Sequence, residues 1–230
     1  MNTRLPAREL LKLFGFFLLF YALFLPLWLG LKAPYQNVVN TLSFKAAGRL
    51  YDIKLIGTKV LPDGTTVMTA TNRYASVGLD GRDKKVVFDA ILDIDAITFN
   101  VPMTLALILA IATVMGTTRK EKIDAVVNGM VLLVALHFLT MFVISLSIII
   151  GTTDQSKDLA FYLQHKWMPK ELLINLGSLL SSYAARFEPF LISVFVWWQL
   201  SMRETGNGEQ EKGKREAESG GNAEPELPHF

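Results

Sequence analysis

The sequence contains no cysteine and only three histidines. The lack of cysteine excludes disulfides, thiolate catalysis and cysteine metal sites. The histidines are His137, His165 and His229, and no two of them have the spacing of metal ligands. We therefore expect no metal site in this protein.

Motifs for nucleotide binding and for hydrolysis are also missing. Glycine-rich phosphate loops of the P-loop or dinucleotide type are absent, and no serine, histidine and acidic residue form a convincing triad. Asp93 and Asp95 share one face of an expected strand, which is typical of a solvated surface. The net charge of +2 does not indicate a nucleic-acid partner. The sequence predicts no catalytic residue and no cofactor.

Long apolar runs are what the chain has in abundance. Hydrophobic residues make up 51% of it and collect into blocks, whereas a soluble domain interleaves them with polar residues. A helix needs about 20 apolar residues to cross the core of a bilayer. We therefore predict a membrane α-helical bundle with four transmembrane helices, over residues 13–31, 96–116, 126–150 and 172–202.

The first apolar block follows three basic residues, as a secretory signal peptide would; they are Arg4, Arg8 and Lys12. The block is longer than the apolar region of a usual signal peptide, and Lys32 and Pro34 make a poor cleavage site. We interpret it as an uncleaved membrane anchor in which Pro26 produces a kink.

Residues 32–95 follow a different pattern. From Tyr35 to Leu50 the apolar spacing fits an amphipathic helix on the membrane surface. Beyond Tyr51 the period changes towards two, and turn signals stand at 62–64 and 79–83. This pattern favours a small β-rich extracytoplasmic domain of three or four strands between transmembrane helices 1 and 2. An irregular connecting loop is the alternative.

Basic residues flank the apolar blocks mainly on one side of the four-helix arrangement, and by the positive-inside rule that side is cytoplasmic. The N-terminus (1–12), the loop 117–125 and the tail 203–230 are then cytoplasmic. Residues 32–95 and the loop 151–171 are then extracytoplasmic. The tail is rich in glycine, glutamate and lysine, and we expect it to be disordered.

Two charged residues, Arg186 and Glu188, interrupt the fourth apolar block. A charge at the centre of a membrane helix costs about 2.5–3.5 kcal/mol on insertion scales, so such residues usually have a partner and a use. Two positions apart, they point to different faces of a helix. Both are candidates for holding the bundle or for binding a partner. In the alternative interpretation the helix begins near Phe187 and Arg186 extends to the membrane surface.

His137 lies near the centre of the third apolar block and is the third candidate site residue. A single histidine in a membrane helix more often makes a structural hydrogen bond between helices than takes part in catalysis. If the fourth helix begins near Leu172, Arg186 lies at a similar depth and could meet His137. If it begins near Leu179, the two are offset by roughly 9 Å.

Three features are similar in layout to the core of exosortases and archaeosortases, membrane enzymes that process C-terminal sorting signals. They are the stretch Ala47–Ile53, the basic turn Arg119–Lys122 before a span that contains Gly129, and Arg186 in a late span. The nucleophilic cysteine of those enzymes has no counterpart here. Over residues 10–200 the chain resembles more closely the exosortase H-associated membrane proteins, a small family without cysteine that is encoded beside one exosortase class.

This resemblance implies a non-enzymatic accessory protein of the bacterial inner (cytoplasmic) membrane, associated with an exosortase-type system for C-terminal protein sorting and surface anchoring. Its expected partners are the lipid bilayer and another membrane protein, such as an exosortase. The alternative is a membrane-embedded enzyme or transporter component that uses His137, Arg186 and Glu188 around a polar cavity. A regulator that senses ligands with residues 32–95 is a third possibility.

Overall fold

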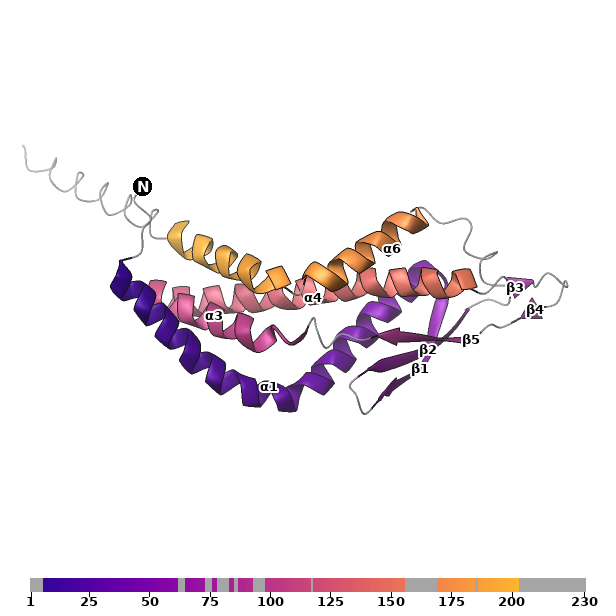
Figure 1. Ribbon diagram of the computed structural model, residues 1–230, viewed down its shortest axis with the longest axis horizontal. Helices are drawn as coiled ribbons and strands as arrows, with labels where there is room; N and C mark the ends of the chain where they lie inside the picture. Colours follow the sequence, from indigo (N-terminus) through magenta and orange to yellow (C-terminus); the bar gives the residue numbers. More distant parts are fainter. Residues whose placement is uncertain are drawn as a thin grey trace, which may run out of the picture.

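The computed structural model is elongated, with helices along most of its length and a small sheet towards one end (Figure 1). Helix α4 (Arg119–Gln155) forms the long axis, and α1, α3, α6 and strand β5 all contact it. The structure describes residues 6–61, 65–72, 76–77, 83–84, 87–92, 98–116, 118–155, 169–184 and 186–202.

Several sequence features fall outside these residues. They are the turn signal at 62–64, most of the turn signal at 79–83, Asp93, Asp95, His165, most of the loop 151–171 and the tail 203–230 with His229.

The first helix, α1, runs without interruption from Ala7 to Leu50. The sequence predicted a membrane helix over 13–31 and a separate amphipathic helix from Tyr35. This division was wrong, because one helix covers both segments. The reason is that Pro34 lies inside the helix, where it removes one backbone hydrogen bond without ending the helical path. Together with Pro26 it accounts for the bend of α1 in Figure 1. The two halves of α1 therefore point in different directions.

The β-rich segment predicted after Tyr51 is confirmed. Strands β1 (Ile53–Val60), β2 (Thr66–Asn72) and β5 (Val87–Leu92) form an antiparallel sheet in the order β1-β2-β5. Strands β3 (Ser76–Val77) and β4 (Asp83–Lys84) form a separate two-stranded ribbon. Alternate residues of β2 are buried, because one face of the sheet packs against the second half of α1 and the end of α4.

The segment predicted as a fourth membrane helix over 172–202 is broken. Helix α6 (Lys170–Leu179) ends in a π-helical turn over Leu180–Ala184, and a second helix covers 186–202. Pro189 explains the break, because a proline has no N–H to donate to the preceding turn and is tolerated only in the first turn of a helix, where it stands in the helix over 186–202. The two helices diverge from this point over the middle of α4 (Figure 1).

By length and composition, two helices of the described part are able to cross a membrane: α1 and the stretch Arg119–Gly151 of α4. Helix α3 (Val101–Met115) is apolar but shorter. The fold is thus mostly helical with a small sheet, and four transmembrane helices are not confirmed. No residue is buried in the most apolar window of α1, so this apolar surface faces outward rather than into a core.

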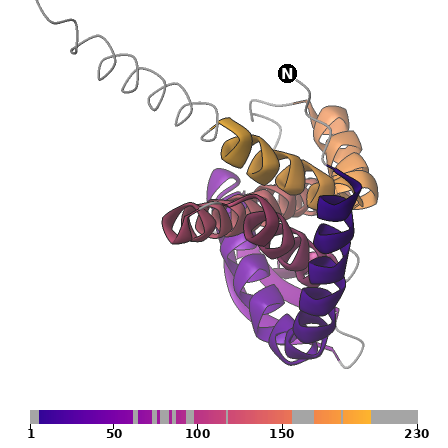
Figure 2. The same cartoon turned by 90° about the vertical axis from the view of Figure 1, so that its left-hand side faces the viewer.

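Two hydrophobic cores lie at opposite ends of α4. The bundle core joins the first half of α1, α3, the first half of α4 and the helix over 186–202, which lie beside one another in Figures 1 and 2. The sheet core joins the second half of α1, the sheet, the second half of α4 and α6. Phe44 and Met141 are fully buried in the sheet core, and Ile108 and Ile192 in the bundle core.

The bundle core packs tightly against Gly129. A Cβ added there would stand 3.0 Å from Ile108 Cδ1 and 3.0 Å from Val196 Cγ2, whereas a Cβ at Gly151 of the same helix meets nothing within 4 Å. We predict that Gly129→Leu forces α3 and the helix over 186–202 apart and lowers the stability by about 1–3 kcal/mol. The melting temperature of the purified protein measures this effect. Gly151→Leu is the matched control, and equal losses in the two variants would contradict the close approach of the three helices.

Candidate functional site

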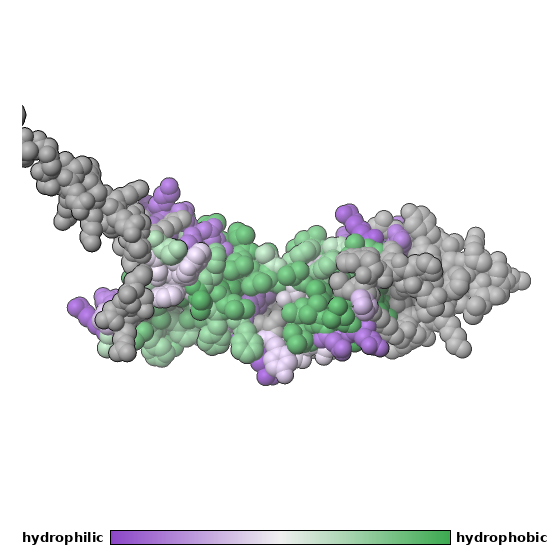
Figure 3. All heavy atoms as spheres, turned by 90° about the horizontal axis from the view of Figure 1, so that it is seen from above, coloured by the Kyte–Doolittle hydropathy of each residue, from purple (hydrophilic) through white to green (hydrophobic). Residues whose placement is uncertain are grey.

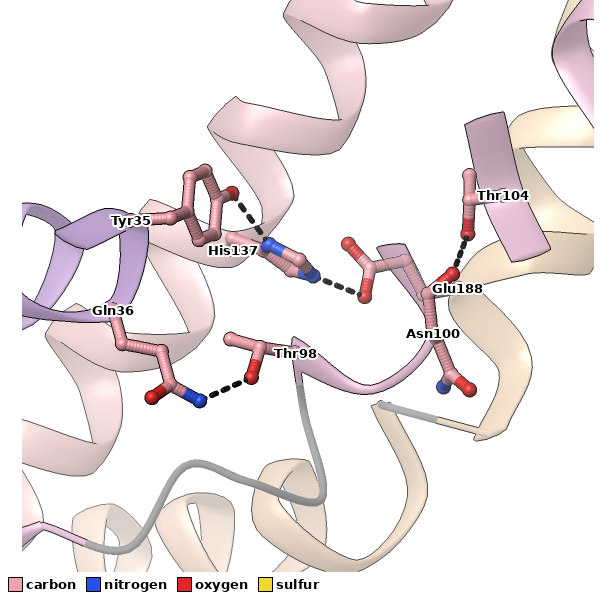
Figure 4. Close-up of polar contacts among 7 residues, drawn as sticks. All are labelled: Tyr35, Gln36, Thr98, Asn100, Thr104, His137 and Glu188. Atoms are coloured by element: carbon pink, nitrogen blue, oxygen red, sulfur yellow. Dashed lines mark hydrogen bonds and ion pairs between the residues drawn. The ribbon is translucent and has the colours of Figure 1, made fainter. Parts of the chain in front are cut away.

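Three polar side chains, of which two are buried and one is partly buried, meet where the bundle core and the sheet core adjoin. His137 Nε2 lies 2.9 Å from Glu188 Oε2, and the Tyr35 hydroxyl lies 2.7 Å from His137 Nδ1. Only 1% of the His137 side chain and 6% of the Glu188 side chain remain exposed. Figure 4 shows the three side chains in a row, each on a different helix. We call this arrangement the Tyr35–His137–Glu188 chain.

Local features of each helix bring these residues together. Glu188 stands in the first turn of the helix that begins after the π-helical turn, and the break directs this turn towards α4. Tyr35 directly follows Pro34, where α1 changes direction. The Trp28 ring covers Tyr35 edge-on, with ring centroids 5.3 Å apart. The bend of α1 at Pro34 and the break before Glu188 therefore allow both helices to place a side chain against His137.

The hydrogen bonds occupy both ring nitrogens of His137. With a neutral imidazole, Nε2–H donates to Glu188 and Nδ1 accepts from the Tyr35 hydroxyl. With an imidazolium, both nitrogens donate and the tyrosine oxygen accepts. The same distances suit either state, so the chain can hold or pass a proton among its members. No ring nitrogen is left to act on a substrate, which favours a structural role for His137 over general-base catalysis.

A second set of buried hydrogen bonds continues from this point along α1. Gln36 Nε2 donates to Thr98 Oγ1 over 2.6 Å, as Figure 4 shows. Asn40 Nδ2 donates to Thr66 Oγ1, and the Ser43 hydroxyl to the backbone carbonyl of residue 138. Spacings of four and three residues put the donors on one face of the helix. The buried face of this half of α1 thus carries polar side chains beside apolar ones, while Val38 and Leu42 of the predicted apolar face are more than half exposed.

The structure separates the two charges that the sequence singled out. Glu188 is buried, whereas Arg186 is exposed on the same helix, as expected for residues two positions apart. His137 contacts Glu188, and no contact between His137 and Arg186 is found among the described residues, although the alternative interpretation grouped all three around one polar cavity. Tyr35 did not figure among the sequence candidates, because a tyrosine near the end of an apolar block is ordinary. The spacing of seven residues between Trp28 and Tyr35, which aligns them on one face, was the available signal.

A groove of about 520 Å³ adjoins this site. It lies between α4, the end of α6 and the start of the helix over 186–202, and Glu188 forms part of its wall. Among the described residues, Glu188 Oε1 has no hydrogen-bond partner. The part of the chain that the structure describes contains no cluster of three histidine, cysteine or acidic residues that could hold a metal ion.

No protein-family model, no curated protein and no solved structure matches this chain.

We predict that replacing one member of the His137–Glu188 pair lowers the stability of the fold more than replacing both members. His137→Leu leaves a buried carboxylate without its partner, and a loss of about 3–5 kcal/mol is expected. The double variant His137→Leu/Glu188→Leu should be more stable than His137→Leu alone, because no buried charge remains. Thermal or denaturant unfolding of the purified variants measures both differences.

Arg186→Leu is the control on the same helix, with an expected change within about 0.5 kcal/mol because Arg186 is exposed. Glu188→Gln is a milder variant that keeps the shape of the side chain in case the leucine variants do not fold. Stability is also measured for Glu188→Leu alone. If the losses of His137→Leu and Glu188→Leu add up to the loss of the double variant, the two side chains are not coupled.

Proposed function

We propose that this protein is a multi-pass protein of the bacterial inner membrane, with both ends in the cytoplasm and the sheet on the extracytoplasmic side. The observation that carries the proposal is the outward apolar surface of the bundle. Large apolar side chains there are half or more exposed, including Phe14, Leu19 and Leu23 of α1, Val131 of α4 and Leu191 of the last helix. Water would make so large an apolar surface unfavourable, whereas a bilayer covers it.

The depth of the Tyr35–His137–Glu188 chain supports this arrangement. Its members stand at roughly 34 Å along α1, 27 Å along α4 and 21 Å along the helix over 186–202, counted at about 1.5 Å per residue from Lys12, Arg119 and Met202. The hydrocarbon core of a bilayer is about 30 Å thick. With these ends at the cytoplasmic surface, the polar chain lies between the outer third of the hydrocarbon and its outer edge. The strands of the sheet then lie beyond the bilayer.

Within this membrane, we propose a non-enzymatic accessory role in which the protein binds another membrane protein. The buried polar residues form hydrogen bonds with one another between segments distant in the sequence. Such bonds stabilise the packing of helices, which supports a structural role rather than a catalytic one. Arg186 is exposed on a helix with apolar surroundings, and an exposed cation at that depth suits an acidic or polar group of a partner. Association with an exosortase-type sorting system rests on the resemblance in layout.

A transporter or enzyme component is the second candidate, and the groove beside Glu188 is the observation that favours it. A buried carboxylate in the wall of a cavity is a common feature of intramembrane binding sites. In this case Glu188 and His137 would serve without Arg186, because Arg186 does not join them.

The orientation can be tested by labelling single cysteines, and the native chain adds no background because it contains none. Lys59 of β1 and Lys120 of α4 are both exposed. In intact spheroplasts, a membrane-impermeant maleimide should label Lys59→Cys at once and Lys120→Cys only after permeabilisation. The reverse pattern would contradict the proposed orientation, and immediate labelling of both would contradict a membrane between them.

The partner role of Arg186 can be tested by purification of the tagged full chain with a co-expressed exosortase from the same genome. Arg186→Leu should reduce recovery of the exosortase about tenfold, because a charged contact in an apolar setting is lost. Arg119→Leu, which removes an exposed arginine at the cytoplasmic end of α4, is the matched control and should leave recovery unchanged. Full recovery with Arg186→Leu, at equal abundance, would refute this contact.

A further inference from the structure

A continuous stripe of exposed apolar side chains runs along α6 and on through the π-helical turn into the last helix. Every member is at least 38% exposed, and within each of the two helices neighbours are three or four positions apart, so they share one face of that helix. Figure 3 looks onto this side and shows extensive apolar surface. The stripe consists of Leu172, Leu176, Leu179, Tyr183, Phe187, Leu191, Val194 and Trp198.

The groove of about 520 Å³ lies along this stripe at the point where the two helices diverge. Its opposite wall is α4, which contributes Leu136, Leu139, Thr140 and Val143. The walls are apolar apart from Thr140, the hydroxyl of Tyr183 and the carboxylate of Glu188. Its volume falls within the range of about 300–1,000 Å³ that is usual for small-molecule sites.

Glu188 has a buried carboxylate oxygen that lacks a hydrogen-bond partner among the described residues. Its Oε2 accepts a hydrogen bond from His137, but its Oε1 is buried and has no partner among the described residues. A buried acceptor without a hydrogen-bond partner is unfavourable, and a charged one is more so. Because the side chain also lines the groove, a donor bound there lies beside the carboxylate.

We propose that the groove binds a membrane phospholipid with a primary ammonium headgroup, with an alkyl chain against the apolar walls and the ammonium donating to Glu188. The proposal rests on the membrane location proposed above. The stripe continues along the helix over 186–202 to Trp198, so a lipid chain enters sideways from the bilayer without crossing water. Glu188 lies in the outer third of the hydrocarbon in that arrangement, on the side of the headgroups of outer-leaflet lipids.

The dimensions and the chemistry favour this occupant over a protein helix. A helix with its side chains is about 10–12 Å across, whereas an extended alkyl chain is only a few ångströms wide and can follow a groove between two packed helices. A primary ammonium supplies three N–H donors, and hydrogen bonds between charged groups are the stronger kind. A choline headgroup has the same charge but no N–H, which makes it the discriminating comparison.

The test uses the full chain in nanodiscs of phosphatidylcholine with a small fraction of a lipid that carries a photoreactive group on its acyl chain. The headgroup of this probe is either ethanolamine or choline, and crosslinked peptides are identified by mass spectrometry. We expect the ethanolamine probe to label the peptides of the groove about tenfold more than the choline probe. Glu188→Gln should remove this preference, since the amide no longer offers an anionic acceptor.

Filling the groove provides the steric control. Val143→Trp, in the wall, should reduce labelling of the groove peptides by the ethanolamine probe to the level of the choline probe. Val131→Trp, at an exposed position of the same helix outside the groove, should leave it unchanged. A variant is included only if its melting temperature and elution volume match those of the unaltered chain. Val143→Phe replaces Val143→Trp if the tryptophan variant does not fold.

Three outcomes would overturn the proposal: equal labelling by the two probes in the unaltered chain, labelling that survives Val143→Trp, or crosslinks from the groove to a second copy of the chain instead of lipid. Resistance of the chain to alkaline extraction from native membranes tests the membrane location separately. A retained chain with an unlabelled groove would refute the lipid site alone, whereas an extracted chain would refute the membrane location.

Discussion

The hydrogen bond between His137 and Glu188 is the contact on which the arrangement of the helices depends. Both groups are buried, and each would be costly to bury without the other. This requirement fixes where the segment over 170–202 crosses α4, because Glu188 must stand opposite His137. The helix break just before Glu188 then lies at the same level, and α6 and the last helix diverge from there.

The same level divides the molecule into two parts with different interiors. On one side is a bundle whose outer surface is apolar and whose core consists of aliphatic side chains and one tryptophan. On the other side, the polar face of α1 is buried by hydrogen bonds to the residues around the sheet and to α4. Tyr35 belongs to both parts, since its ring packs on Trp28 and its hydroxyl bonds to His137. A boundary of this kind suits a protein that passes from lipid to water.

The candidate site could be predicted from the sequence only in part. His137 and Glu188 stood out because a polar or charged side chain in an apolar block is costly and needs a partner. Their pairing could not be predicted, because it depends on where the fourth apolar block begins and breaks. A continuous helix from Leu172 would have left Arg186 as a plausible partner of His137. The turn over Leu180–Ala184 changes the direction of the chain and brings Glu188 inward instead.

By itself, the sequence determined the apolar blocks, the basic ends and the β-rich segment after Tyr51, because these are local properties of composition and period. The tertiary structure alone decided that α1 continues through Pro34, which of the two charges is buried, and that Tyr35 completes the chain of hydrogen bonds. These outcomes depend on groups far apart in the sequence that satisfy one another only once the helices are packed. The free energy of burying a polar group is set by its partner, and no local pattern names that partner.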